Sequence, residues 1–299
     1  MTNSSLSSSD IFLFDRKLLR SRRSRAAGGD WEKNRFLFDE VADRLAERIL
    51  DISKQFDLAL DLGCHGGSFG KMLKMQGRIS HLISADLSPA LMVPHADGIK
   101  VVADEEFLPF APRSFDLIGN VLGLHWTNDL PGALVQIARA LKPDGLFLGA
   151  MYGIESLSEL KWSLTQAELE VKDGMSPRIS PFTDVRDAGS LLQRAGFALP
   201  VTDVDVLTLK YPNAFALMQE LRGMGEANAL VERQKNLTGR KVLLRAAEIY
   251  QEKFADDDGL IPATFQVIYL AGWAPHENQQ KALKRGSGQT SLKDILSKD

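Results

Sequence analysis

The sequence is poor in cysteine, with Cys64 as the single one among 299 residues. One cysteine cannot build an intramolecular disulfide, a cysteine-based zinc site or a protein-ligated iron–sulfur cluster, so a packed apolar core has to stabilise the chain. The composition is 44% hydrophobic and 25% charged, which is ordinary for a globular protein. The length fits two units or one elaborated α/β domain.

The sequence also lacks a large excess of charge and a long apolar run. Its 36 basic and 39 acidic residues give a net charge of -3, which argues against electrostatic binding of nucleic acid or of an anionic membrane. The longest uncharged apolar stretch, Leu260–Pro275, is shorter than the roughly 20 residues that cross a bilayer. We therefore expect a soluble protein with no nucleic-acid partner and no membrane span.

The first residues are rich in serine but have neither the basic nor the apolar segment of a secretory signal. Six lysines and arginines follow between Arg16 and Arg25, as in a mitochondrial transit peptide, although Asp10 and Asp15 interrupt that pattern. We expect a bacterial cytoplasmic protein, with the mitochondrial matrix as the alternative. Residues 1–30 are interpreted as a flexible basic arm, with docking to an acidic protein surface or covering of a cofactor cleft as functional alternatives.

The hydrophobic pattern predicts a doubly wound, mainly parallel α/β sheet, because short apolar runs alternate with helical segments. One domain is expected over 31–275, with its core at about 50–150 and a substrate or lid elaboration over 151–260, followed by a mobile polar tail over 276–299. The expected strands are 58–62, 81–85, 100–103, 115–120, 146–150, 201–209 and 264–272, and the expected helices are 31–50, 69–75, 128–141, 155–172, 184–195, 213–222 and 240–254.

Acidic residues stand at the ends of three successive predicted strands. Asp61 precedes a glycine-rich turn over 63–67, where glycine lets the backbone approach a ligand closely. Asp86 has the placement of an acid that accepts ribose hydroxyls, and Asp104 with Glu105 can accept from an adenine amino group. Parallel strand ends share one edge of a sheet, so these residues predict an acidic rim that favours a cationic ligand over a pyrophosphate.

These motifs, together with Ala85–Ser88, Ser114–Leu117 and Leu141–Gly145, resemble those of the class I S-adenosylmethionine-dependent methyltransferases. The resemblance implies a Rossmann-like, seven-stranded sheet whose last strand is antiparallel. It also implies S-adenosylmethionine as the cofactor.

By this resemblance Asp61 and Gly63 face the amino acid moiety of the cofactor, Asp86 faces the ribose, and Asp104 with Glu105 faces the adenine. The family usually has glycine where this chain has His65, which predicts a tighter loop or an altered affinity. Cys64 is interpreted as packing beneath the ligand rather than as a nucleophile. The full set of expected cofactor-binding residues is Asp61, Gly63, Cys64, His65, Gly67, Asp86, Leu87, Asp104, Glu105 and Asn120.

A closer resemblance, to the mitochondrial complex I assembly factor 5 group, covers nearly the whole chain. Proteins of this group have a methyltransferase fold, and the reaction attributed to them is hydroxylation of an arginine in a subunit of NADH:ubiquinone oxidoreductase. The resemblance implies a protein partner and an arginine as the modified side chain. The segments that carry it are Phe14–Arg16, Ala103–Phe110, Leu124–Pro131, Ser176–Phe182, Gly223–Asn228 and Pro262–Gln266.

Candidate catalytic residues follow the fourth predicted strand. Methyl transfer requires a positioned nucleophile and, where that nucleophile is protonated, a base. His125 is the candidate base because histidine titrates near neutral pH. Asn120 is a second candidate catalytic residue, and Trp126 is a candidate substrate contact. A structural role for His125, packed on Trp126, explains the residue equally well. The residues after Asn120 are not the prolines of the Asn-Pro-Pro-Tyr motif. Their absence disfavours a DNA adenine or a glutamine amide as substrate.

Three functions stay open from the sequence. The first is an enzyme that binds S-adenosylmethionine and modifies a protein, with an arginine of a complex I subunit as the expected substrate. The second is a carboxyl O-methyltransferase, because Leu217–Gly225 resembles the lid of malonyl carrier-protein methyltransferases and Arg222 can pair with a carboxylate. The third is a non-catalytic assembly chaperone.

Hydroxylation raises the question of an iron site, which needs two histidines and a carboxylate. His95 and Asp97 supply half of that set, with His125 or His276 as a conceivable third ligand. The acidic rim explains more residues, so no metal site is expected.

Overall fold

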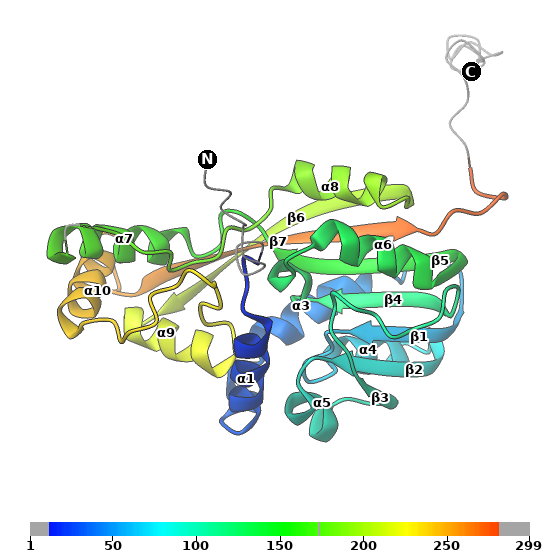
Figure 1. Ribbon diagram of the computed structural model, residues 1–299, viewed down its shortest axis with the longest axis horizontal. Coiled ribbons are helices and arrows are strands. Elements are labelled where there is room, and N and C mark those ends of the chain that lie inside the picture. The colour runs from blue at the N-terminus through cyan, green and yellow to red at the C-terminus, as the bar shows by residue number, and fades with distance from the viewer. Residues whose placement is uncertain (1–11, 173, 281–299) are drawn as a thin grey trace, which may run out of the picture.

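The computed structural model describes residues 12–172 and 174–280, and its centre is a seven-stranded sheet with the order β3-β2-β1-β4-β5-β7-β6 (Figure 1). Neighbouring strands from β3 to β5 are parallel, whereas β7 is antiparallel to both β5 and β6. This arrangement confirms the predicted doubly wound α/β fold. The strands are β1 (Phe56–Leu62), β2 (Ile79–Asp86), β3 (Ile99–Val102), β4 (Phe115–Val121), β5 (Leu141–Tyr152), β6 (Ala198–Tyr211) and β7 (Ile261–Trp273).

Helices cover both faces of the sheet, because the side chains of its central strands alternate between two apolar clusters. In β1, Ala59 packs in the cluster beneath α3 and α4, and Leu60 packs in the opposite cluster beneath α6 and α8. The helices are α1 (Arg16–Ala27), α2 (Trp31–Asn34), α3 (Phe36–Glu47), α4 (Ser68–Met75), α5 (Pro89–His95), α6 (Leu130–Ala140), α7 (Ser158–Lys172), α8 (Val185–Arg194), α9 (Ala214–Gly223) and α10 (Arg240–Phe254), with a 3-10 turn η2 (Leu124–Trp126).

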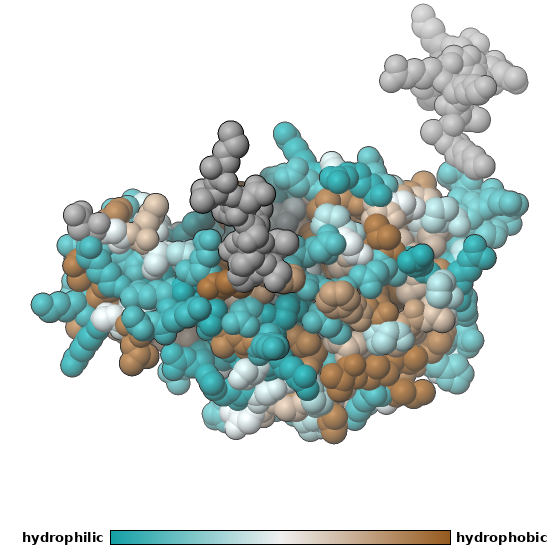
Figure 2. All heavy atoms as spheres, viewed as in Figure 1, coloured by the Kyte–Doolittle hydropathy of each residue, from teal (hydrophilic) through white to brown (hydrophobic). Residues whose placement is uncertain are grey.

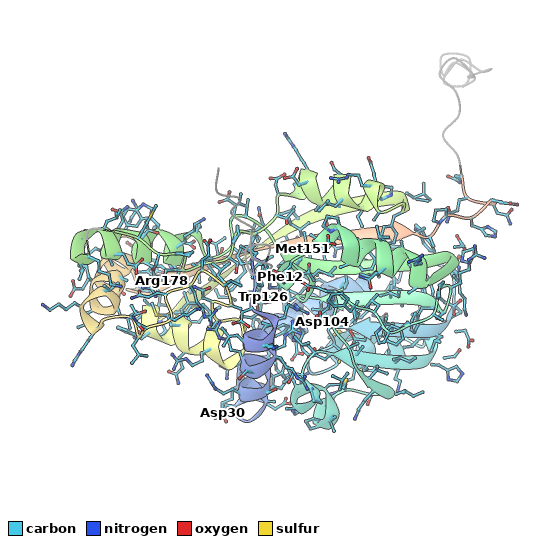
Figure 3. The ribbon with its side chains drawn as sticks, in the orientation of Figure 1. Phe12, Asp30, Asp104, Trp126, Met151 and Arg178 are labelled. Carbon is cyan, nitrogen blue, oxygen red and sulfur yellow. The ribbon has the colours of Figure 1, made fainter. Side chains whose placement is uncertain are left out.

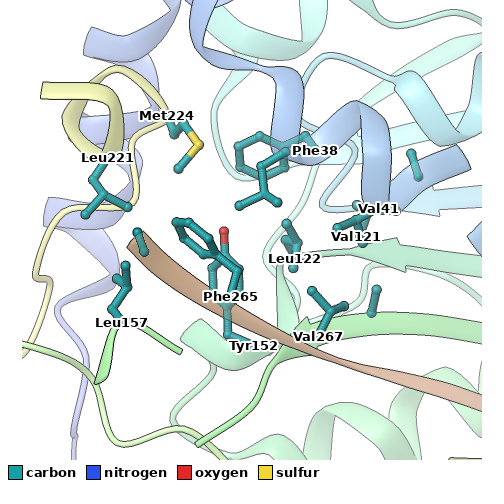
Figure 4. Packing of buried hydrophobic residues seen from close by; sticks show 14 of the residues in the cluster. Phe38, Val41, Val121, Leu122, Tyr152, Leu157, Leu221, Met224, Phe265 and Val267 are labelled. Carbon is teal, nitrogen blue, oxygen red and sulfur yellow. The ribbon is translucent and has the colours of Figure 1, made fainter. Parts of the chain in front are cut away.

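The long strands β6 and β7 extend beyond the rest of the sheet, and α7, α9 and α10 gather around their far ends (Figure 1). We call this part the lobe. The Tyr250 hydroxyl donates to the Pro262 carbonyl over 2.7 Å and ties α10 to β7. Leu157 and Met224 pack near Tyr152 and Phe265 where the lobe meets the central sheet (Figure 4). One apolar cluster therefore runs from the sheet into the lobe.

The interpretation of residues 1–30 as a flexible arm is wrong for the described residues 12–30. Residues 16–27 form α1, which begins after Asp15, whose side chain accepts a hydrogen bond from the Leu18 backbone. The helix lies between α5 and α9 (Figure 1) and contacts both. Residues 1–11, and the part of the expected mobile tail over 281–299, lie outside the described residues.

Two expected elements have different bounds. The helix expected over 31–50 is interrupted at Arg35, where the Asn34 side chain donates to the Asp30 carbonyl. The strand expected over 146–150 is longer, because β5 begins at Leu141, which already pairs with Phe115 before a register shift. Hydrophobic side chains gather at the edge formed by β3 and α5 (Figure 2), and the exposed ones there include Val93, Ile99 and Val102.

Among the described residues, no helix combines the length and the apolar character that crossing a bilayer requires.

Candidate active site

The turn after β1 uses backbone conformations that favour glycine. Gly63 and Gly67 have φ values of 61° and 74°, and a Cβ on Gly63 would lie 2.9 Å from the Glu105 carboxylate. His65 has a φ of 46°, which is strained for a non-glycine residue. Its ring packs against Phe38 at a centroid distance of 4.4 Å. His65 is thus accommodated in a position whose backbone explains the glycine usual in the family.

Asp61 ends β1 with a carboxylate that is only half satisfied. Its Oδ2 accepts from the Gly70 backbone over 3.1 Å, whereas its Oδ1 is buried without a partner among the described residues. Burial raises the pKa of Asp61 from 3.8 to about 7. A cationic group beside Oδ1 would supply the missing contact and would lower the free-energy cost of ionising Asp61.

Asp86 ends β2 and is also buried. Its two carboxylate oxygens accept from the backbones of Ser88 and His65, over 2.7 and 3.0 Å. Burial raises the pKa of Asp86, and the Arg23 guanidinium, 3.6 Å away, acts in the opposite direction. Together with Glu105, which follows β3, Asp61 and Asp86 form what we call the carboxylate cluster.

Glu105 is held by two arginines of α1 that the sequence interpretation did not assign to the site. Arg23 lies 3.1 Å from its carboxylate, and Arg16 contacts both Glu105 and Asp104. Burial alone would raise the pKa of Glu105, but Arg16 and Arg23 lower it to about 2. Asp104 lies at the edge of the site, with its side chain 23% exposed.

Arg23 is buried inside the site with an incomplete set of partners. Its side chain has 0% exposure, and its Nε and one Nη donate to no atom of the described residues. Burial alone lowers the pKa of Arg23, but Asp86, Glu105 and Glu226 raise it above the ordinary value, so the group is charged. The helical spacing of Arg16, Leu19, Arg23 and Ala26 is the signal that could have placed both arginines on one inward face.

The segment before α1 is fastened over the site. Phe14 packs edge-on against Trp126 at 5.3 Å, and its backbone donates to the Asn128 side chain over 2.7 Å. A short antiparallel pairing joins Phe14 to Leu230 in the segment after α9. This segment and the arginines of α1 therefore cover the carboxylate cluster.

Two other predicted site residues, Asn120 and Cys64, have structural roles in this arrangement. The Asn120 amide donates to the Leu62 carbonyl over 2.8 Å, and its oxygen accepts from the Gly123 and Leu124 backbones at 3.1 Å each. Asn120 therefore positions the loop after β4, and its catalytic role stays a prediction. Cys64 packs with Met92 and Ala96, and burial raises the pKa of its thiol.

Leu87 and Gly67 support the neighbouring helices. Leu87 packs in the cluster formed by Phe14, Leu19 and Trp126. Gly67 precedes α4, and a Cβ there would lie 2.7 Å from the Cα of Ala96. Both residues border the carboxylate cluster through packing rather than through polar atoms.

His125 and Trp126 share one carboxylate, that of Glu226. The Glu226 Oε2 lies 3.1 Å from His125 Nε2 and accepts from Trp126 Nε1 over 2.9 Å. Burial alone would raise the pKa of Glu226, but His125, His65 and Arg23 lower it below its ordinary value. The sequence interpretation missed Glu226 as a site residue, although it quoted the segment 223–228 for the family resemblance.

A pocket with a volume of about 220 Å³ lies next to Glu226, between the lobe and the sheet. We call it the aromatic pocket, because Trp126, Tyr152 and Phe182 line it together with aliphatic residues of α7 and α9. Arg222 lies at its exposed rim, and Arg178 belongs to its lobe side (Figure 3). Trp126 and Arg222, both predicted to contact substrate, thus border one cavity.

The histidines considered for a metal site have other partners. His95 Nδ1 lies 3.2 Å from Glu32, and His125 pairs with Glu226. Across residues 12–172 and 174–280, no group of three His, Cys, Asp or Glu side chains is arranged to hold a metal ion.

The strand order, the glycine turn and the strand-end carboxylates define a class I methyltransferase fold. Residues 32–200 match the family described as the methyltransferase domain. A candidate methyltransferase of Bacillus halodurans has a similar structure, with a TM-score of 0.54 at 17% identity over 79% of this chain and 99% of that one, which shows the fold.

The human protein named arginine-hydroxylase NDUFAF5, mitochondrial, is 44% identical over 95% of this chain and 83% of its own length. A malonyl-[acyl-carrier protein] O-methyltransferase of Methylovorus is 34% identical over 89% of this chain and 91% of its own. This chain belongs to the NDUFAF5 family of methyltransferase-fold enzymes.

Segments quoted for the family resemblance converge around the aromatic pocket and the carboxylate cluster. Trp126 and Glu226 are hydrogen-bonded across a sequence separation of 100 residues. Ser176–Phe182 and Gly223–Asn228 are joined by the Asn228 side chain, which donates to the Pro177 carbonyl over 2.8 Å. The fold thus brings these segments together at one site.

Proposed function

We propose that this protein binds S-adenosylmethionine at the carboxylate cluster and modifies an arginine side chain of a protein substrate. The observation that carries the binding step is the set of buried, unpartnered polar atoms there, namely Asp61 Oδ1 and the two free donors of Arg23. Buried polar atoms ordinarily have partners, so an acceptor and donors left free at one site indicate a ligand that carries both charges. The amino acid moiety of S-adenosylmethionine has this chemistry.

The residues of the cluster suit the parts of the cofactor. Asp86 is the acceptor for ribose hydroxyls, Asp61 is the partner for the ammonium group, and Arg23 is the donor to the carboxylate. When bound, S-adenosylmethionine supplies a methyl group on a sulfonium, whose positive charge the acidic surroundings stabilise. His125, held by Glu226 through Nε2 and buried with its Nδ1 unpartnered among the described residues, is the proposed acceptor of a substrate proton.

The proposed substrate is an arginine in a protein, because relatives at 43% and 44% identity carry the name arginine-hydroxylase. The resemblance to complex I assembly factors makes a complex I subunit the proposed partner. The name of these relatives also includes the word mitochondrial, which favours the matrix over the bacterial cytoplasm expected from the sequence. Fractionation of host cells decides between the two compartments.

Calorimetry tests the binding step. We expect heat on titration of the wild-type protein with S-adenosylmethionine, and at least a tenfold weaker affinity for Asp86→Ala. Asp57→Ala is the matched control, because Asp57 is an exposed carboxylate on β1. Circular dichroism of each variant verifies folding. An absence of heat with wild-type protein, or an unchanged affinity in Asp86→Ala, would contradict the proposal.

Mass spectrometry of the host's complex I subunits, with and without this gene, tests the reaction. A gain of one oxygen on an arginine indicates hydroxylation, and a gain of one methylene indicates methylation. Unchanged masses in every subunit would contradict an arginine-modifying function and favour the assembly chaperone.

The second candidate function is carboxyl O-methylation of an acyl carrier thioester. Arg222 supports it, because this exposed arginine lines the pocket rim and forms no ion pair with a described residue. The buried Glu226 carboxylate argues against this second function, because Glu226 repels a substrate carboxylate in the same pocket. Methylation of a malonyl carrier protein that Arg222→Ala abolishes would establish this function.

A further inference from the structure

The aromatic pocket has one polar end and one open end. Its volume of about 220 Å³ is below the roughly 300–1,000 Å³ of sites for drug-sized ligands. This size suits a single long side chain. The inner walls are Trp126, Tyr152 and Phe182, and Tyr152 and Phe182 are in edge-on contact at 5.6 Å. Glu226 lines the same pocket as these rings, so a side chain that occupies it lies among aromatic rings and next to a carboxylate.

Glu226 supplies that carboxylate and leaves one of its oxygens free. Its Oε2 serves both His125 and Trp126, whereas its Oε1 is buried without a partner among the described residues. The side chain is only 2% exposed. An unpartnered carboxylate oxygen in a buried position costs free energy, so the site is incomplete until a donor approaches it.

We propose that the aromatic pocket binds the guanidinium group of the substrate and that the free oxygen of Glu226 is its anchor. This inference rests on the proposed function and adds the residue that selects the substrate. A guanidinium is planar and weakly hydrated, it stacks on aromatic rings, and it donates to carboxylates. Glu226 is also linked to the carboxylate cluster through Trp126, whose indole donates to Glu226 and whose carbonyl accepts from Arg16 over 3.2 Å.

The two arginines of the pocket do not cancel this preference. Arg178 is neutralised by Glu168, which accepts from its Nε over 3.1 Å, and it also donates to Thr238 over 2.6 Å. Arg222 is exposed at the rim, where water and salt screen its charge. The buried carboxylate therefore sets the electrostatic potential at the inner end.

Binding of small probes tests the anchor without any turnover. The probes are N-acetylargininamide and its citrulline counterpart, which has nearly the same shape but an uncharged ureido group. We expect wild-type protein to bind the arginine probe at least tenfold more tightly than the citrulline probe in NMR titrations. Glu226→Gln is expected to remove this difference, and Glu232→Gln, an exposed change in the same segment, is expected to retain it.

Equal affinity for the two probes, or an unchanged preference in Glu226→Gln, would overturn the inference. Preferential binding of malonate that Arg222→Ala removes would also overturn it, in favour of a carboxylate substrate. Should Glu226→Gln fail to fold, Phe182→Leu is the second variant, because it keeps an apolar wall but removes a stacking face. It is expected to weaken the arginine probe at least threefold, and an unchanged affinity would count against the pocket.

The test of this inference can be distinguished from the test of the proposed function. Calorimetry with S-adenosylmethionine reports on the carboxylate cluster, and the probe titrations report on the aromatic pocket. Cofactor binding without guanidinium selectivity rejects only the present inference. Guanidinium selectivity without cofactor binding rejects only the cofactor proposal.

Discussion

Arg23 is fully buried beside two carboxylates, and we expect its replacement to have a large effect on stability. It neutralises Asp86 and Glu105 at 3.6 and 3.1 Å in the interior. Removing one partner of a buried ion pair leaves an uncompensated charge, at a cost of about 3–5 kcal/mol. We expect Arg23→Met to lower the free energy of unfolding by this amount in urea denaturation. Arg20→Met, an exposed change on the same helix, is expected to have little effect, and equal effects of both would show that Arg23 is not specifically paired.

Asp61 is a residue that makes the stability of the folded protein depend on pH. Its pKa is raised from 3.8 to about 7, so the folded protein keeps a proton that the unfolded chain releases within this range. The stabilisation that comes from the bound proton of Asp61 is fully present below pH 4. It is lost as the pH rises to 7, and the free energy of unfolding falls by up to about 1.4 kcal/mol for each pH unit.

We expect Asp61→Asn to remove this part of the pH dependence, so that its stability relative to wild type increases between pH 5 and pH 8. Urea denaturation at the two pH values measures the difference. Asp57→Asn, on the exposed side of the same strand, serves as the control. Parallel pH profiles for wild type and Asp61→Asn would contradict the raised pKa.

Among the helices, α1 covers the carboxylate cluster, and we expect it to control the access of a ligand. Its Ser24 hydroxyl lies 2.9 Å from that of Ser88, the residue before α5. A disulfide in the double variant Ser24→Cys/Ser88→Cys would fix α1 over the site. We expect the oxidised variant to bind S-adenosylmethionine at least tenfold more slowly in stopped-flow fluorescence, with recovery after reduction. An equal rate in both redox states would show that the ligand enters without movement of α1.

The structure of α1 is poorly predicted by its composition. The charge of the basic run 16–25 predicts a flexible arm, whereas its Arg16, Leu19 and Arg23 recur at helical spacing. Charge alone did not distinguish an exposed arginine from one that neutralises buried carboxylates. The strand-end acids were located correctly because a parallel sheet places strand ends at one edge whatever the loops do.

At the scale of the whole molecule, β7 joins the central sheet to the lobe. Phe265 of β7 has 1% exposure and contacts Tyr152 at a centroid distance of 5.9 Å, so it packs at their boundary. Replacing a buried phenylalanine by alanine costs about 3–5 kcal/mol. We expect Phe265→Ala to lower the midpoint of one cooperative transition, seen equally by fluorescence and by circular dichroism. Two separated transitions would show that the lobe unfolds independently.

The sheet, the glycine turn and the carboxylates at strand ends can be predicted from the amino-acid sequence, because they depend on local periodicity and on the geometry of parallel strands. The contact of Arg23 with the carboxylate cluster, and that of Glu226 with Trp126 across 100 residues, are seen only in the folded structure. Such contacts depend on how α1 and the segment after α9 pack onto the finished sheet. No local pattern encodes the partner of a buried charge, because burial and proximity arise only when distant segments fold together.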